Sequence, residues 1–147
     1  MENDGNNFIY APLVNYADHT FGVCQKMLED KNAIMGLGDG GAHVGFILDA
    51  GYPTWLISYW SVKKKVFSME ETIRRLTSDT ASAAGLKDRG CLKVGLKADL
   101  NILDWEKIGS SDPFMVQDLP AGGRRLMQHT YCLLYTSPSP RDVEETR

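Results

Sequence analysis

A glycine-rich stretch, "NAIMGLGDGGAH" from Asn32 to His43, constrains the fold of this chain more than any other segment. A brief apolar run leads into it, and four glycines then surround a single carboxylate, that of Asp39. A short apolar run that is ended by glycines is typical of a buried parallel strand. The pattern predicts a strand over residues 32–38 that ends in a tight turn, with Asp39 at its carboxyl tip.

The segments before this stretch predict a strand or loop edge over residues 8–16 and then a helix. The helix is expected over Asp18 to Lys31, where apolar residues recur at near-helical spacing. The order strand, helix, strand with short connections is typical of an α/β sheet or barrel.

The segments after the glycines predict several helices between Tyr52 and Leu86. Pro53 suits a first helical turn, and Ser68 with Glu71 forms a capping box. Gly85 is placed where a left-handed residue ends a helix. An apolar stripe is expected on the first of these helices, formed by Trp55, Leu56, Tyr59 and Trp60.

The rest of the chain changes character at "DRGCLKVGLKADLNILDW", which is rich in turn residues and has short alternating apolar positions. This stretch predicts the start of a small β unit. The final sequence, Cys132 to Arg147, shifts abruptly to Ser, Pro and Arg, and "LLYTSPSPRD" resembles a translated adaptor sequence. We therefore expect residues 132–147 to be a non-native tail and exclude them from the fold.

Charge and composition argue against nucleic-acid binding and against a membrane-spanning helix. A net charge of -3 gives no basic field for nucleic acid, and no apolar run has the length of a membrane-spanning helix. Three widely spaced cysteines do not form a disulfide framework, so a reducing, cytoplasmic setting is expected. These features predict neither a nucleic-acid nor a membrane partner, and they say nothing of the oligomeric state.

The glycines themselves allow two interpretations. Gly36, Gly38 and Gly41 satisfy a dinucleotide or phosphate-binding pattern, but Asp39 would place negative charge inside the anion cradle. The other interpretation places Asp39 at the end of the sheet that carries active sites in α/β proteins. Asp beside Gly is also ordinary turn chemistry, so the residues alone leave a catalytic and a structural role open.

Metal-binding motifs are missing from the sequence. His43 lies four residues after Asp39 and reaches the same region, but the chain has no paired histidines or C-x-x-C. The sequence therefore does not supply a complete three- or four-ligand zinc site.

Three blocks, in order, resemble one family. They are "GLGDGGAHVGFILDAGYPTWLISYW", "RRLTSDTASAAGLKDRGCLKVGLKADLNILDW" and "DLPAGGRRLMQ". Together they are similar to the C-terminal portion of N-acyl-D-amino-acid deacylases, the D-aminoacylase-like enzymes of the amidohydrolase superfamily. The resemblance extends over residues 8–128.

The resemblance implies an α/β fold, a metal-dependent (β/α)8 barrel joined to a small β domain. Residues 1–88 would be the last strands and helices of the barrel, and residues 89–131 would be part of the β domain. The stretch 32–39 would then be the eighth barrel strand. The chain would be an incomplete piece of the enzyme, unstable and inactive alone, with the other metal ligands encoded upstream.

The resemblance also implies the site. Asp39 would bind beside zinc and act as general base and then general acid in the cleavage of an N-acyl-D-amino acid. His43, Gly38 and Gly40 would contact the substrate. A related amidohydrolase acting on a cyclic amide and a non-catalytic scaffold are the alternatives within the superfamily.

Overall fold

A computed structural model describes residues 14–16, 18–36 and 38–136, with only the backbone of residues 133–136. The chain divides into two compact units, residues 1–33 and residues 34–147. The predicted strand over residues 8–16 lies mostly outside the described residues, and its described part, residues 14–16, is not a strand.

The described residues of the first unit form helix α1 (Gly22–Glu29), which is shorter than the predicted segment 18–31. The residues before it form a local turn instead of a helical turn. Asp18 accepts hydrogen bonds from the backbone N–H of Thr20 at 3.1 Å and from its hydroxyl at 2.8 Å. The hydrogen bond from the Thr20 hydroxyl has the larger effect and the one from the Thr20 N–H the smaller, and both lower the pKa of Asp18. Side chains of this type compete with helical hydrogen bonds, so α1 begins only at Gly22.

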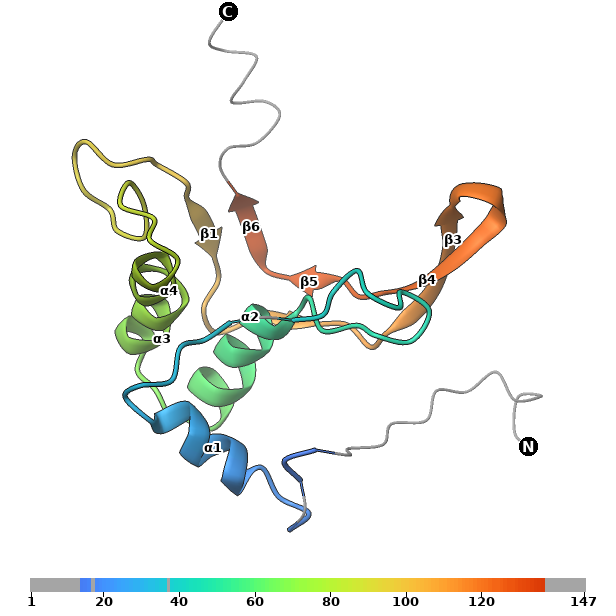
Figure 1. The fold of residues 1–147 in the computed structure, drawn as a ribbon, viewed down its shortest axis with the longest axis horizontal. Helices are drawn as coiled ribbons and strands as arrows, with labels where there is room; N and C mark the ends of the chain where they lie inside the picture. The colour runs from blue at the N-terminus through green and yellow to red at the C-terminus, as the bar shows by residue number, and fades with distance from the viewer. Residues whose placement is uncertain (1–13, 17, 37, 137–147) are drawn as a thin grey trace, which may run out of the picture. The chain divides into compact units, whose positions relative to one another are not determined.

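The second unit begins with residues 34–50, which contain no strand or helix among their described members. The predicted parallel strand over residues 32–38 is therefore wrong for its described part. A strand requires a neighbour for its backbone hydrogen bonds, and no described segment runs beside this one as a parallel partner. The described residues form a small mixed α/β structure with no closed barrel (Figure 1).

Four helical segments follow, as the sequence predicts for residues 52–86. They are α2 (Tyr52–Trp55), the π-helix η2 (Leu56–Lys63), α3 (Met69–Leu76) and α4 (Ser78–Ala83). Pro53 lies in the first turn of α2. The π-helix is a difference from the sequence expectation, which did not distinguish it from α-helix; it ends with a bond from Lys64 N–H to Tyr59 C=O at 2.8 Å.

The helix ends follow the sequence signals. The Ser68 hydroxyl accepts a hydrogen bond from Glu71 N–H at 3.2 Å, so Ser68 is the N-cap of α3. The carboxylate of Glu71 binds Arg75 at 2.7 Å rather than completing the capping box. At the end of α4, Gly85 has φ +72°, and Leu86 N–H reaches Ala81 C=O at 2.8 Å. This geometry is a Schellman motif, as Gly85 predicts.

The core of this unit lies where η2 meets α3. Trp60 is 2% exposed and Thr72 is completely buried. The Thr72 hydroxyl is hydrogen-bonded to Ser61 and donates to Ser68 C=O at 2.8 Å. Trp60 and Leu56 of the predicted apolar stripe are buried, whereas Trp55 is 42% exposed and stacks on Tyr59. None of the described helices is long and apolar enough to cross a membrane.

The C-terminal part consists of short antiparallel pairs. The strands are β1 (Asn101–Leu103), β2 (Gly109–Ser110), β3 (Phe114–Leu119), β4 (Gly123–Met127), β5 (Thr130–Tyr131) and β6 (Leu133–Thr136), with the 3-10 turn η3 (Pro120–Gly122) between β3 and β4. They pair as β1 with β6, β2 with β5 and β3 with β4. Short strands do follow residue 88, and the assignment of residues 89–131 to a small β domain stays a prediction.

One pair involves the segment that the sequence analysis set aside. Strand β6 lies within residues 132–147, and its backbone pairs with β1, so Ile102 is opposite Tyr135. Residues 137–147 lie outside the described residues. The fold therefore uses the first residues of the expected tail as a strand, and the non-native origin of the tail stays a prediction.

Glycine 90 gives a first test of the packing around α4. Its φ is +92°, and a Cβ there would lie 2.9 Å from Ala81 Cβ and 3.0 Å from Ser78 Cα. Gly95 has a similar φ of +90° with nothing within 4 Å. We expect Gly95→Ala to destabilise the chain by about 1–2 kcal/mol and Gly90→Ala by a further ~1–3 kcal/mol, measured by urea unfolding. Equal effects would contradict the close approach.

The Glu71–Arg75 ion pair gives a second test, by pH. The hydrogen bond from Arg75, more than any other contact, lowers the pKa of Glu71 below its ordinary value of 4.5. The pair therefore contributes stability above about pH 4.5, and this contribution is lost as the pH falls through the lowered pKa. Glu71→Gln is expected to lower the melting temperature by about 1–2 °C at pH 7.

The same comparison at low pH completes the test. Wild type and Glu71→Gln should converge once Glu71 is protonated. Glu106→Gln, at an exposed position, is the control and should behave as wild type throughout. A difference between wild type and Glu71→Gln that persists unchanged at pH 2.5 would contradict the assignment.

Candidate functional site

The segment 38–50 forms an irregular loop built from consecutive turns, and it contains every predicted site residue. Ala42 N–H donates to Asp39 C=O at 2.9 Å. Phe46 and Ile47 then donate to His43 C=O at 2.9 and 3.1 Å. Farther along the chain, Leu126 N–H of β4 donates to Val44 C=O at 2.8 Å. The loop is thus held both by its own turns and by the β3–β4 hairpin.

Asp39 is held by its main chain and exposed at its side chain. Its backbone N–H donates to Asp49 Oδ2 at 2.5 Å. Its carboxylate takes part in no hydrogen bond or ion pair with another described residue, and the residue is exposed. A carboxylate presented in this way is free to accept a proton, to donate one or to bind a cation.

The glycines beside Asp39 allow two backbone segments to approach closely. A Cβ on Gly38 would lie 2.8 Å from Asp49 C=O and 3.1 Å from Asp49 Cγ. A Cβ on Gly40 would lie 2.8 Å from Ala50 Cβ. The two distances of 2.8 Å are shorter than the contacts that real Cβ atoms make, so the loop requires glycine at these positions. The structure gives Gly38 and Gly40 a packing role, and their contact with substrate stays a prediction.

His43 lies on the surface of the same loop. It has φ +47°, and its ring stacks on Phe46 with centroids 5.1 Å apart and an interplanar angle of 26°. Phe46 is 71% exposed. The structure therefore places a two-ring surface four to seven residues after Asp39 in the chain, and the role of His43 in substrate binding stays a prediction.

Asp49 is the functional candidate that the sequence analysis missed. It lies in "ILDAGYP", where it reads as a residue before a helix start rather than as a partner of Asp39. Its Oδ1 is buried and has no hydrogen-bond partner among the described residues. The only sequence signal was an aspartate directly before Ala-Gly-Tyr-Pro, which does not reveal a contact ten residues back.

The described residues lack the full set of ligands that the zinc ion implied by the resemblance requires. Among the described residues, no three His, Cys, Asp or Glu side chains lie close enough together to hold a metal. Asp39 offers one exposed carboxylate, a suitable single ligand, but the described residues do not fit a zinc site by themselves. No chemical step is therefore assigned to a metal from this geometry.

The same loop does not have the geometry of a dinucleotide cradle. That cradle lies between a strand and the N-terminus of a helix. Residues 33–36 are not a strand, and residues 40–50 form turns and bends without a helix. The glycine pattern of Gly36, Gly38 and Gly41 thus lacks the structural context that would give it a phosphate-binding function.

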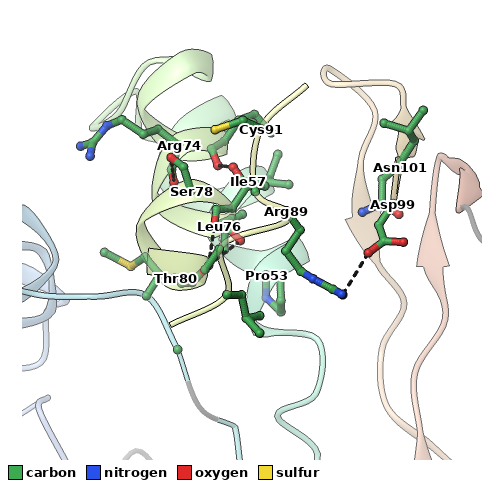
Figure 2. Close-up of a pocket in the computed structure, with 18 of the residues that line it drawn as sticks. Pro53, Ile57, Arg74, Leu76, Ser78, Thr80, Arg89, Cys91, Asp99 and Asn101 are labelled. Atoms are coloured by element: carbon green, nitrogen blue, oxygen red, sulfur yellow. Dashed lines mark hydrogen bonds and ion pairs between the residues drawn. The ribbon is translucent and has the colours of Figure 1, made fainter. Parts of the chain in front are cut away.

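A large cavity lies elsewhere in the second unit, with a volume of about 1290 Å³. It is bordered by residues 34–36, by α2, η2, α3 and α4, and by residues 86–103 (Figure 2). Ile57, Ile73 and Leu76 contribute apolar side chains to it. None of Asp39, His43, Gly38 and Gly40 lines this cavity. The cavity and the predicted site are thus different places on the molecule.

Charged groups at the cavity form an ion pair rather than a reactive cluster. Arg89 donates to Asp99 at 3.0 Å, as Figure 2 shows. A hydrogen bond from Arg89 to Asp88, followed by the charges of Asp88 and Asp99, raises the pKa of Arg89. Arg89 therefore remains a cation and has no part in proton transfer.

Comparison with known proteins gives one family. The sequence model described as "Amidohydrolase family" matches residues 14–122, which include the whole loop 38–50. No curated protein and no solved structure matches the chain.

Gly40→Ala tests the close approach that shapes this loop. The added Cβ would also meet Ala50 Cα at 3.2 Å and Ala50 N at 3.3 Å, which are backbone atoms that cannot rotate away. We expect a loss of about 1–3 kcal/mol in the free energy of unfolding, measured with urea. Gly45→Ala, with nothing within 4 Å, is the matched control and should leave stability unchanged or raise it by up to ~1 kcal/mol.

Proposed function

The chain belongs to the amidohydrolase family, and from this premise we propose that it is part of a zinc-dependent hydrolase that cleaves the amide bond of N-acyl-D-amino acids. Family membership supports a hydrolase. The deacylase type rests on the resemblance of three sequence blocks. The observation that carries the proposal in the structure is the exposed carboxylate of Asp39 on a loop whose backbone is held in place.

Asp39 is proposed as the group that moves protons. As a base its carboxylate accepts a proton from the attacking water, and as an acid it delivers that proton to the leaving amine nitrogen. Both steps require a carboxylate that water and substrate can reach. The exposed side chain of Asp39 meets this requirement.

Zinc, when bound, would lower the pKa of its water and polarise the amide carbonyl. Asp39 is the one residue among those described that we propose as a zinc contact. The remaining ligands would be further histidines or a cysteine or carboxylate outside the described set, consistent with the absence of a three-ligand cluster within it.

The loop around Asp39 would define one wall of the substrate site. The main chain at Gly38 and Gly40 lies against Asp49 and Ala50, and neither glycine has a side chain that could shield the Asp39 carboxylate. His43 and Phe46 would offer an apolar ring surface to the acyl group or to the amino-acid side chain. The products would be a carboxylate and a free D-amino acid.

Asp39→Asn tests the proposal in the protein expressed from its complete open reading frame. We expect kcat for N-acetyl-D-amino acids to fall by about 10²–10⁴-fold, because an amide cannot relay the proton. Release of free D-amino acid measures the reaction, and the L-enantiomers are tested in parallel. Zinc content is measured for each variant by atomic emission.

Asp112→Asn is the matched control, because Asp112 is an exposed aspartate of the same unit and lies far along the chain from the loop. It should retain wild-type turnover. Near-normal turnover of Asp39→Asn would remove Asp39 from the mechanism. A wild-type protein that binds zinc but hydrolyses only cyclic amides would contradict the deacylase proposal and leave the hydrolase class intact.

A further inference from the structure

We propose that Asp49 is the positioning residue for Asp39, holding its main chain so that the reactive carboxylate points in one direction. This inference rests on the proposed function of Asp39. It concerns a residue ten positions away whose side chain reaches the backbone of Asp39 and does not touch substrate. Asp49 would act only through Asp39.

The need for such a residue follows from the sequence of the loop. Asp39 stands between Gly38 and Gly40, and Gly41 follows with φ +97°. Glycines leave the backbone on both sides of Asp39 free to take many conformations. A catalytic group in such a segment loses rate unless something else restricts it, because a displacement of about 1 Å changes turnover by up to ~10²-fold.

The hydrogen bond to Asp49 supplies this restriction. Asp39 N–H donates to Asp49 Oδ2 at 2.5 Å, and the acceptor is a carboxylate, which forms the stronger kind of hydrogen bond. The backbone of Gly38 lies directly on the same side chain, because an added Cβ would lie 3.1 Å from both Cγ and Oδ1 of Asp49. The segment before Asp39 and its own N–H therefore meet one carboxylate.

Asp49 is itself held by the start of the helices. Its C=O accepts a hydrogen bond from Tyr52 N–H at 3.1 Å, and Trp55 N–H donates to Gly51 C=O at 3.0 Å. A Cβ on Gly51 would lie 3.1 Å from the Gln128 side-chain oxygen, so this corner also packs against the β segment. The position of Asp39 is thereby fixed relative to helix α2 and not only relative to the loop.

The burial of one carboxylate oxygen of Asp49 adds an independent observation. Its Oδ1 is buried and accepts no hydrogen bond from a described residue. A carboxylate oxygen in this state destabilises the fold, because it has lost water without gaining a donor. A residue that only filled space would serve better as an apolar side chain. The hydrogen bond from Asp39 N–H is the interaction that the described residues offer in return.

Two variants of Asp49 separate positioning from general stability. Asp49→Ala removes the acceptor, and we expect kcat to fall by about 10–100-fold while KM changes by less than ~3-fold. Asp49→Asn keeps an oxygen acceptor in nearly the same place, so we expect kcat within about 5-fold of wild type. The substrate is the N-acetyl-D-amino acid, and the protein is expressed from its complete open reading frame.

Gly38→Ala keeps both aspartates and displaces their contact by a steric route. Its Cβ would lie 2.8 Å from Asp49 C=O, a backbone atom, so Asp49 and residue 39 must separate. We expect the same fall in kcat as for Asp49→Ala. Gly45→Ala, in the same loop with nothing within 4 Å, is the matched control and should keep wild-type turnover.

Amide hydrogen exchange of Asp39 gives a readout that does not depend on activity. Protection of this N–H should be present in wild type, retained in Asp49→Asn and lost in Asp49→Ala. Loss of kcat in Asp49→Ala with recovery in Asp49→Asn supports the proposal. Equal losses in both variants, or an Asp49→Ala enzyme within about 3-fold of wild type, overturn it.

The remaining outcomes are also decisive. If Asp49→Ala does not fold, Gly38→Ala decides, and wild-type turnover in Gly38→Ala overturns the proposal. If Asp39→Asn is fully active, the proposed function has failed, whereas the exchange of the Asp39 N–H still reports whether Asp49 holds it. A fully active Asp49→Ala beside an inactive Asp39→Asn removes only the positioning role.

Discussion

The hydrogen bond between Asp39 N–H and the Asp49 carboxylate connects the two segments on which the proposed function depends. One side of it is a glycine-rich loop with little conformational preference of its own. The other is the first turn of α2, which the Asp49 carbonyl joins through Tyr52. The contact is possible only because Gly38 and Gly40 have no Cβ, so the glycines that loosen the loop also allow it to be held.

The site and the cavity beside the helices have different physical characters. The loop presents a carboxylate, a histidine and an exposed phenylalanine to solvent. The cavity is bordered by apolar helix residues and also by the Arg89–Asp99 ion pair. Amide hydrolysis requires a group that exchanges protons, and Asp39 of the loop presents an exposed carboxylate for the proposed reaction. The residues that match the family include this loop.

Local signals in the sequence were reliable where a feature depends on a few neighbouring residues. Ser68 caps α3, Pro53 lies in the first turn of α2, and Gly85 ends α4 in the left-handed conformation. The predicted strand over residues 32–38 failed for the opposite reason, since a strand is defined by a partner that the described chain does not place beside it. Burial on α3 does not follow polarity either, because the polar side chains of Thr72 and Arg75 are buried whereas the apolar Ile73 borders the cavity.

The sequence by itself determined the N-cap of α3, the left-handed end of α4 and the presence of one carboxylate among glycines, because each follows from steric preferences of adjacent residues. It also carried enough of a family pattern to predict Asp39 as the reactive group. Only the tertiary structure decided that Asp49 accepts the Asp39 N–H and that the glycines pack against residues 49 and 50. Those contacts join residues ten positions apart through an irregular loop, and no periodicity of the sequence encodes such a path.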